Sequence, residues 1–492
     1  MNNRKGVPAN YLYNISGILI PTAASLGTVP FYIHQIGLAR YGVVTITWVL
    51  LGYFGFLDFG LSRATANALA KQGHASPRER SPILVTAFCC NLCLGMIGGL
   101  IMYLIGHLVL LNLVKIPNSL LGETRDAYPW MAAMLPLGML AGVSNGALES
   151  RERFLLSNAL GSFGTVMGQV MPLLCTYVFG PTLEVVIPAT LLARLLMVLL
   201  AYEVVIRLEW PLRLRDFDVK LVRQLFRYGS WVSISSLLNP LLDTSAQMIT
   251  GIMLGPAAVA AYAVPMTLAT RSQVFATALS RALFPRVSRL QHAEALATTQ
   301  RATLTLAYGF GMICAPAILF SGPFLRIWVG SHFQAVSQSV AQIVMFGAWT
   351  NGLAFLPYGF LQAQGRPHIT AMAAAVEILP FMALLWFLIT LFGLPGAALA
   401  WTLRVTINCI ILQVVSGCIA RQAWSLFPAL VLMLLSLLLA RLVPMGIPAA
   451  AGAAALAGLA FAGLGCMIDP VIRDSALRVG RRLGLLPPRR LT

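Results

Sequence analysis

The chain has 492 residues, of which 58% are hydrophobic and only 10% are charged, and its mean hydropathy is +0.80. Soluble globular proteins carry about 25% charged residues, so this composition excludes an ordinary soluble protein. A net charge of +18 would suggest nucleic-acid binding in a soluble chain, and the positions of the basic residues decide whether that applies here.

Apolar runs of about 20 residues, the length that a helix needs to cross a bilayer, recur from Tyr11 almost to the end of the chain. They predict an all-α, polytopic membrane protein with about 14 transmembrane helices. In chain order the predicted spans are residues 11–36, 42–70, 82–113, 127–148, 155–179, 185–206, 228–254, 257–284, 301–321, 339–363, 369–392, 397–420, 425–443 and 447–468. The first run continues past any small-residue cleavage site, so we expect a retained helix and not a signal peptide.

The basic residues are distributed unevenly between the two sides of the membrane that the predicted spans define. Most of the 34 Lys and Arg residues fall in loops or tails on the side of the N-terminus. The few on the opposite side are Arg40, Lys115, Arg125, Arg326 and Arg441. By the positive-inside rule both termini are expected in the cytoplasm of a bacterial cell, with the chain in the cytoplasmic (inner) membrane. The basic charge is therefore a topology signal, and we expect no nucleic-acid partner.

The sequence offers little for catalysis. Its eight cysteines lie within predicted spans without a histidine cluster nearby, so they are expected to pack as small apolar residues. The loops are short, no Gly-rich phosphate loop precedes a helix, and no His, Cys or Asp group has metal or nucleophile spacing. We expect no catalytic residues, no metal and no cofactor, and hence a protein that is not an enzyme.

Short motifs recur at a slowly drifting offset. "LSRA" at 61–64 returns at 279–282, and at the same offset of 218 positions Gly37 matches Gly255. Two further pairs match as follows: "GALESRERF" (146–154) with "GFLQAQGRP" (359–367), and Arg194 with Arg404. Two diverged copies with small loop deletions would leave this pattern, so we predict two six-helix bundles with a pseudo-twofold relation and two extra helices.

This repeat sets the predicted domains. Residues 1–206 form the N-terminal six-helix bundle, 228–420 the C-terminal one, and 421–492 two additional helices with a basic cytoplasmic tail. Residues 207–227 form a cytoplasmic interfacial linker. Within it the apolar residues Phe217, Leu221 and Leu225 recur at i, i+4 and i+8, as in a helix that lies on an anionic leaflet.

Six charged residues lie near mid-span, where each costs about 2.5–3.5 kcal/mol on insertion scales and persists only if paired or hydrated. They are Asp58, Arg194, Asp243, Arg271, Glu377 and Arg404. Two interpretations stay open. The arginines could pair with the carboxylates as structural glue, or they could line a cavity and bind an anionic group through permanent charge and bidentate donors. In the second case the carboxylates would be free to carry a coupling proton or Na⁺.

Asp58 also belongs to the stretch "LDFGLSRATANALAK" (57–71), with Arg63 five residues later. On one continuous helix these two residues point about 140° apart, so we expect their partners elsewhere. Arg63 and its counterpart Arg281 lie near the cytoplasmic ends of their spans, where anchoring and substrate binding are equally open. Arg271 is the strongest single candidate for substrate binding.

Several segments resemble one known family. "IGLARYG" (36–42) and "FGFLDFGLSRATANALA" (54–70) resemble the start of the bacterial polysaccharide transporter family. This family contains the O-antigen and exopolysaccharide repeat-unit flippases of the multidrug/oligosaccharidyl-lipid/polysaccharide superfamily. "LGPAAVAAYAVP" (254–265) and "LQAQGRP" (361–367) resemble its later segments, so that the likeness covers essentially the whole chain.

The resemblance implies two six-helix bundles forming a V around a central cavity that opens alternately to each side. It implies a flippase that moves undecaprenyl-diphosphate-linked oligosaccharide repeat units across the inner membrane. Arg271, Arg194 and Arg404 fall where cationic cavity residues of this family are expected. With Arg63 and Arg281 they are the predicted substrate-binding residues, and Asp58, Asp243 and Glu377 are the predicted ion-coupling residues, with H⁺ or Na⁺ as the coupling ion. Three deep carboxylates offset these arginines, which departs from a strongly positive lumen.

The expected partners are the lipid-linked glycan and the bilayer, together with polysaccharide polymerase and glycosyltransferases. Two alternatives remain open. A cation-coupled multidrug exporter of the same superfamily would need acidic residues in its cavity more than arginines. A scaffold subunit of glycan assembly would move no lipid-linked sugar by itself.

Overall fold

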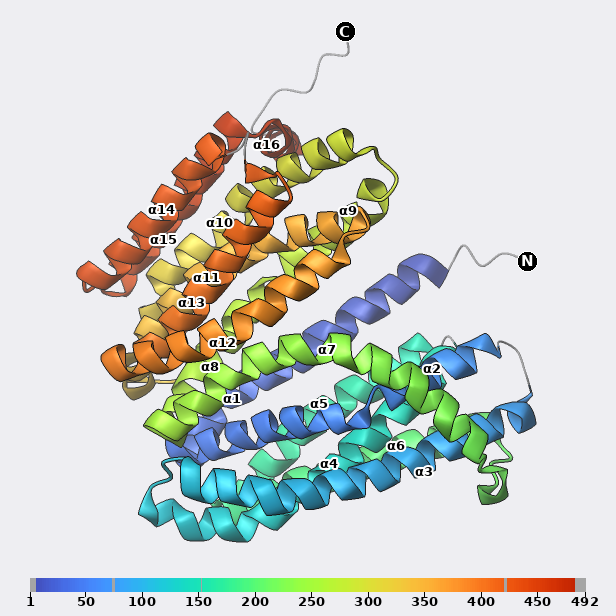
Figure 1. Ribbon diagram of the computed structural model, residues 1–492. Helices are drawn as coiled ribbons and strands as arrows, with labels where there is room; N and C mark the ends of the chain where they lie inside the picture. The colour runs from blue at the N-terminus through green and yellow to red at the C-terminus, as the bar shows by residue number, and fades with distance from the viewer. Residues whose placement is uncertain (1–5, 73–75, 152, 420–422, 483–492) are drawn as a thin grey trace. The chain divides into compact units, whose positions relative to one another are not determined.

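The computed structural model describes residues 6–72, 76–151, 153–419 and 423–482 (Figure 1). Every regular element in these residues is helical. Eleven of the described helices are long and apolar enough to cross a membrane. The prediction of an all-α, multi-pass membrane protein is therefore confirmed, whereas the number of about 14 spans is not confirmed by length and composition.

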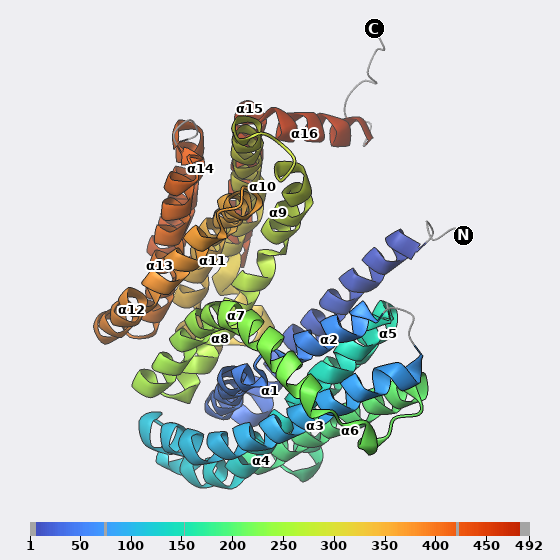
Figure 2. The same cartoon turned by 45° about the vertical axis from the view of Figure 1, so that its right-hand side comes forward.

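The chain divides into two compact units, Met1–Ala260 and Ala261–Thr492, which we call the N-terminal and the C-terminal unit. The predicted domain boundaries stay predictions. The elements of the N-terminal unit are α1 (Gly6–Phe54), η1 (Gly55–Asp58), α2 (Leu61–Lys71), α3 (Pro77–Ile101), η2 (Met102–Gly106), η3 (Val109–Leu113), α4 (Asn118–Ser150), α5 (Phe154–Phe179), α6 (Leu183–Glu209), η4 (Leu214–Asp216) and α7 (Val219–Leu254). Within it α3, α4 and α6 run side by side (Figure 2).

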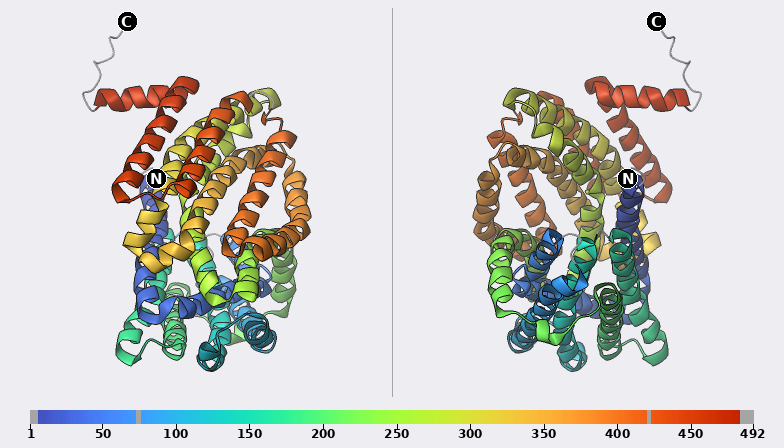
Figure 3. Two further views of the ribbon diagram at one scale, coloured as in Figure 1. Left: turned by 90° about the vertical axis from the view of Figure 1, so that its left-hand side faces the viewer. Right: turned by 90° about the vertical axis from the view of Figure 1, so that its right-hand side faces the viewer.

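The helix α8 (Pro256–Ser272) begins in the N-terminal unit and continues into the C-terminal unit. The C-terminal unit continues with α9 (Val274–Val287), α10 (His292–Trp328), α11 (Ser331–Ala363), α12 (Pro367–Phe392), α13 (Leu394–Val415), α14 (Ala423–Leu442), α15 (Ile447–Ile468) and α16 (Pro470–Arg482). Figure 3 shows α16 turning sharply away from α15. Asp469 sits at this turn, where it accepts a hydrogen bond from the backbone N–H of Val471 at 2.9 Å.

The first two predicted spans are divided differently from expectation. They join in α1 across a kink at Gly37, whose φ of 81° suits a glycine. The predicted continuous helix over 42–70 is wrong, because it breaks into the 3₁₀ turn η1 and the separate helix α2. Phe59 and Gly60 between them both have positive φ, which ends a right-handed helix.

The two units carry the predicted internal repeat in their helix lengths. Both α4 and α11 have 33 residues, and both α5 and α12 have 26. The bounds of these pairs differ by the same 213 positions as the matching motifs. Gly255, the counterpart of Gly37, has a φ of 86° close to the 81° of Gly37. The two copies therefore share the same unusual backbone conformation at Gly37 and Gly255.

Each unit has its own apolar core. In the N-terminal unit Ile46, Tyr128 and Ile187 bring α1, α4 and α6 together. The segment predicted as an interfacial linker contributes to a second cluster, because Leu225 in the first turns of α7 is only 3% exposed and packs with Leu61. In this structure Leu225 of that segment faces protein, whereas Phe217 is 43% exposed.

A close helix contact in the N-terminal unit gives a first prediction. A Cβ atom added at Gly42 would overlap the carbonyl oxygen of Pro256, a backbone atom that cannot rotate away. We expect Gly42→Ala to lower the free energy of unfolding by about 1–3 kcal/mol, the usual cost of overpacking. The change is measured by unfolding titration of purified protein in mixed micelles.

The matched control is Gly52→Ala on the same helix, where an added Cβ meets nothing within 4 Å. That variant should be neutral or slightly stabilising, because alanine is the better helix former. Equal stability of the two variants would contradict the close contact at Gly42.

Candidate functional site

The N-terminal unit contains a cavity of about 460 Å³ between α4, α5 and α6, with Trp48 of α1 at its side. Its polar lining residues are Ser144, Asn145, Thr165, Gln169, Thr190 and Arg194. A volume of this size and a few convergent polar groups are typical of a small-ligand site. No aspartate or glutamate is among the described residues that line it.

Glycines on α5 keep this cavity open. Gly161, Gly164 and Gly168 follow one another at i, i+3 and i+7, so they share one face of the helix, and all three line the cavity. A Cβ atom at Gly161 or Gly168 would meet nothing within 4 Å. The space is therefore a consequence of the sequence of α5.

Arg194 on α6 supplies the charge of the cavity. Its guanidinium carbon lies 4.8 Å from the ring centroid of Trp48, a cation–π distance. It also donates a long hydrogen bond of 3.5 Å to the carbonyl of Met134. Among the side chains that the structure describes, no carboxylate forms an ion pair with Arg194. The predicted deep arginine therefore faces a cavity with donors to spare.

The side chain of Gln169 is positioned by α1. The hydroxyl of Tyr32 donates to the carbonyl of Gln169 at 2.7 Å, and the hydroxyl of Thr28 lies 3.5 Å from its side-chain oxygen. These contacts hold the middle of α5 against α1. Gln169 also lines the cavity.

The corresponding arginine of the C-terminal unit has different surroundings. Phe381 and Glu377 both belong to α12. The guanidinium carbon of Arg404 on α13 lies 5.0 Å from the ring centroid of Phe381, and Arg404 interacts electrostatically with Glu377. Asn408 donates a hydrogen bond to the carboxylate of Glu377. Arg404 and Glu377 therefore lie close together in one copy, whereas Arg194 lines a cavity in the other, and both interpretations of the deep charges stay predictions.

Asp58 has a local partner. Its carboxylate accepts hydrogen bonds from the backbone N–H of Ser62 at 3.4 Å and from the hydroxyl of Ser62 at 3.2 Å. Asp58 therefore caps the start of α2. The expectation that its partners lie elsewhere is wrong because it assumed a continuous helix, and the break at Gly60 turns Asp58 back onto the next helix.

This capping gives a second prediction. Asp58→Ala is expected to lower the free energy of unfolding by about 0.5–2 kcal/mol, the usual cost of a lost cap. The two bonds reach different carboxylate oxygens, so Asp58→Asn should lose less, because its single amide oxygen can still accept one of them. Equal losses in the two variants, measured by thermal unfolding in detergent, would show that Asp58 does not act as a cap.

The remaining predicted residues are placed as follows. Arg63 on α2, Arg271 in the last turn of α8 and Arg281 on α9 are exposed. Arg63 interacts electrostatically with Asp58. Asp243 belongs to α7, but its side chain lies outside the described part of the structure. The arginines are thus divided between the units, with Arg63 and Arg194 in one and Arg271, Arg281 and Arg404 in the other.

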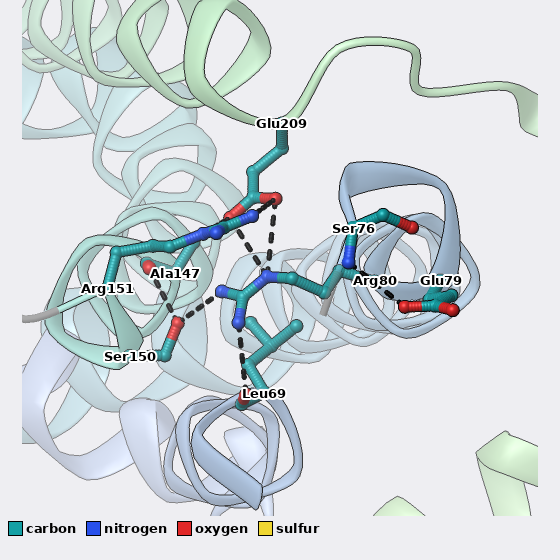
Figure 4. Close-up of polar contacts among 8 residues, drawn as sticks. All are labelled: Leu69, Ser76, Glu79, Arg80, Ala147, Ser150, Arg151 and Glu209. Atoms are coloured by element: carbon teal, nitrogen blue, oxygen red, sulfur yellow. Dashed lines mark hydrogen bonds and ion pairs between the residues drawn. The ribbon is translucent and has the colours of Figure 1, made fainter. Parts of the chain in front are cut away.

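Sequence reasoning missed a buried charge cluster at the ends of α2, α3, α4 and α6 (Figure 4). Arg80 is fully buried and donates to both oxygens of Glu209 at 3.0 and 3.2 Å, to the carbonyl of Leu69 at 3.0 Å and to the hydroxyl of Ser150 at 2.6 Å. Arg151 donates two hydrogen bonds of 2.8 Å to the same Glu209 carboxylate. Hydrogen bonding to Glu209 raises the pKa of Arg151 above its ordinary value.

This cluster ties four helix ends together through one carboxylate. In the sequence Arg80 and Arg151 are only two of many basic residues in the predicted cytoplasmic loops. The cluster could have been predicted from Glu209, an acidic residue just after an apolar span on the side of the membrane where most basic residues lie. Because each hydrogen bond is charge-assisted, the cluster should hold these ends in a fixed arrangement. Its role is structural, since Glu209 is 1% exposed and out of reach of a ligand.

Two copies of an apolar helical bundle, with arginines inside the spans, define a multi-pass membrane protein built like a transporter. The family model described as "Polysaccharide biosynthesis protein" matches residues 7–291, more than half of the chain. The chain belongs to this family. A second model, "MatE", matches residues 232–388.

Similar proteins agree with this assignment. The chain is 28% identical over 411 residues to a Shigella flexneri protein named "Putative O-antigen transporter", covering 82% of this chain and 96% of that protein. It is 23% identical over 400 residues to the Haloferax volcanii protein "Probable low-salt glycan biosynthesis flippase Agl15", covering 78% of each. These names describe transport and not enzymatic chemistry, in agreement with the prediction.

The fold is similar to that of a solved structure entitled "Lipid II flippase MurJ, inward closed conformation". The TM-score is 0.71 at 14% sequence identity, with 92% of this chain and 98% of that chain covered. The predicted superfamily is confirmed by the two family models and the similar proteins, and the predicted all-α, multi-pass fold class by this structural likeness.

Proposed function

We propose that this protein is a flippase that moves a lipid-linked glycan across the bacterial cytoplasmic membrane by alternating access. The observation that carries the proposal is the match to the protein named as an O-antigen transporter, because it extends over 96% of that protein. The finer proposal is that the substrate is an undecaprenyl-diphosphate-linked oligosaccharide repeat unit. Both termini are proposed to lie in the cytoplasm, as the distribution of basic residues predicts.

Transport of this substrate needs cations inside the membrane. A diphosphate with attached sugars cannot enter hydrocarbon unaided, because charged groups leave water only at a cost of many kcal/mol. We propose that Arg271, Arg194, Arg404, Arg63 and Arg281 replace the hydration of the head group while the lipid tail stays in the bilayer. Arg271 is the principal residue of this set, since it is exposed within a predicted span and close to the break between α8 and α9.

Direction requires that the two facing states bind substrate or ion differently. We propose that Asp58, Asp243 and Glu377 take part in coupling to H⁺ or Na⁺. Asp58 and Glu377 accept hydrogen bonds from the neutral side chains of Ser62 and Asn408.

The cavity of the N-terminal unit argues against the multidrug exporter. A site for organic cations would be expected to present carboxylates, whereas the described lining residues include an arginine and no acid. A non-transporting scaffold is addressed by the reconstitution experiment of the Discussion. Polysaccharide polymerase and glycosyltransferases are proposed partners, because they would consume and supply the translocated glycan.

Deletion of the gene tests the proposed function in cells. The expected result is loss of surface polysaccharide and accumulation of a lipid-linked oligosaccharide on the inner leaflet, both reversed by the wild-type gene. Accumulation of no lipid-linked sugar, with normal surface polysaccharide, would contradict the proposal.

A further inference from the structure

The helix α16 has one apolar and one charged side. Ile472, Ala476 and Val479 recur at i, i+4 and i+7, the spacing of one helix face. Arg478 and Arg481 occupy positions on the opposite side of the same helix. A helix with apolar residues on one face and arginines on the other is typical of segments that lie in the surface of a membrane.

The charge of this segment is strongly positive. From residue 470 onwards the sequence contains six arginines and a single acidic residue, Asp474. Arg473 and Arg478 are exposed, and Arg478 donates a hydrogen bond of 3.2 Å to the backbone carbonyl of Asp474. No carboxylate among the described residues forms an ion pair with either arginine. The charges of both arginines are therefore available to an anionic partner outside the protein.

The direction of α16 is fixed by Asp469, which is 3% exposed. Its carboxylate caps α16 through the N–H of Val471 and also accepts a hydrogen bond from the hydroxyl of Thr305 on α10. Its backbone N–H donates to the carbonyl of Gly465 on α15 at 2.8 Å. Because one buried residue bonds to α10, α15 and α16, the last helix leaves α15 in a set direction (Figure 3).

The neighbouring helix α14 indicates the level of the membrane surface at this turn. Tyr308, about one turn after Thr305 on α10, donates a hydrogen bond of 2.7 Å from its hydroxyl to the carbonyl of Ser425. Trp424, which precedes Ser425 at the start of α14, is 88% exposed. Tryptophan is enriched where membrane spans meet the water interface. The turn into α16 therefore lies near the level where α14 enters the bilayer.

We propose that α16 lies in the surface of the membrane and binds the anionic head groups of phospholipids. Ile472 in its first turn packs against the C-terminal unit, and the rest of α16 extends away from α14 and α15 (Figure 2). Arg473 and Arg478 supply cations for the lipid phosphates. The inference concerns lipids of the bilayer and not the transported glycan, so it stands whether or not the protein is a flippase.

Hydrogen–deuterium exchange of the full-length protein in lipid nanodiscs tests the proposal. One set of discs contains phosphatidylcholine alone, and the other contains phosphatidylcholine mixed with phosphatidylglycerol as the anionic lipid. We expect the backbone amides of α16 to exchange more slowly in the anionic discs by about tenfold or more, since each arginine near an anionic surface contributes about fivefold. The amides of α15 should exchange equally in both sets, because the fold is the same.

Three variants identify the cause of the slower exchange. The double variant Arg473→Gln/Arg478→Gln should lose most of the slowing, while its exchange in phosphatidylcholine discs stays that of the wild type. The double variant Arg473→Lys/Arg478→Lys should keep the slowing, because attraction to a charged surface needs the charge and not the guanidinium shape. Arg326→Gln changes an exposed arginine in the last turn of α10, about 30 Å along that helix from Thr305, and should behave like the wild type.

The proposal is overturned if α16 of the wild type exchanges equally fast in both kinds of disc, because the helix would then be free or held by protein. A loss in the lysine variant as large as in the glutamine variant would also overturn it, as would an equal loss in Arg326→Gln, since the effect would not come from the charges of α16. None of these measurements involves transport, so failure here is distinguishable from failure of the proposed function.

Discussion

Replacing Glu209 with glutamine is expected to lower the free energy of unfolding by about 3–5 kcal/mol, the usual cost of removing one partner from a buried ion pair. Glu209 neutralises Arg80, whose side chain is 0% exposed, and also binds Arg151. Without the carboxylate, Arg80 would remain buried with an uncompensated charge. The measurement is equilibrium unfolding of purified protein in mixed micelles, followed by tryptophan fluorescence.

The same helix offers a matched control. Glu203 pairs with Arg207 at 2.6 Å, but their side chains are 52% and 78% exposed. Exposed pairs contribute about 0–1 kcal/mol, so Glu203→Gln should change stability little. If Glu209→Gln proved as mild as Glu203→Gln, the buried cluster would not be what holds the four helix ends together.

The largest functional effect is expected for Arg271→Ala, which should abolish surface polysaccharide while the protein still inserts in the membrane. Arg271 is exposed in the last turn of α8, inside a predicted span. Loss of its permanent charge removes the bidentate donors proposed to replace the hydration of the diphosphate. The measurement is complementation of a deletion strain, scored by surface polysaccharide.

Arg207→Ala serves as the control for this variant, because Arg207 is 78% exposed and pairs only locally with Glu203 among the described residues. It should restore polysaccharide as the wild type does. Both variants need equal amounts of protein in the membrane fraction. Full export by Arg271→Ala at wild-type abundance would reject the proposed role of Arg271.

The sequence alone predicts the all-helical fold and its repeat, since hydrophobic length and motif spacing are local properties. The equal lengths of α5 and α12 follow the offset read from two nine-residue stretches. The break of the helix within 42–70 was not predicted, because the span was defined by its apolar composition. Gly55 and Gly60 indicate such a break, since glycine readily adopts backbone conformations that end a helix.

The candidate site could be predicted only in part. Arg194 stood out as a deep cation, but its surroundings depend on which face of α5 turns towards α6. Composition cannot distinguish glycines that bring helices together from glycines that leave a cavity. The cluster of Arg80, Arg151 and Glu209 joins residues far apart in the sequence, so no local pattern contains it.

The central claim is tested most directly in liposomes containing the purified protein and fluorescently labelled undecaprenyl-diphosphate-linked oligosaccharide. A membrane-impermeant reagent that destroys the label reaches only molecules in the outer leaflet. The account predicts that wild-type protein exposes nearly all of the labelled lipid to the reagent, whereas Arg271→Ala leaves about half protected, as expected for a symmetric bilayer without exchange. Protection of half the label by the wild-type protein would contradict the account.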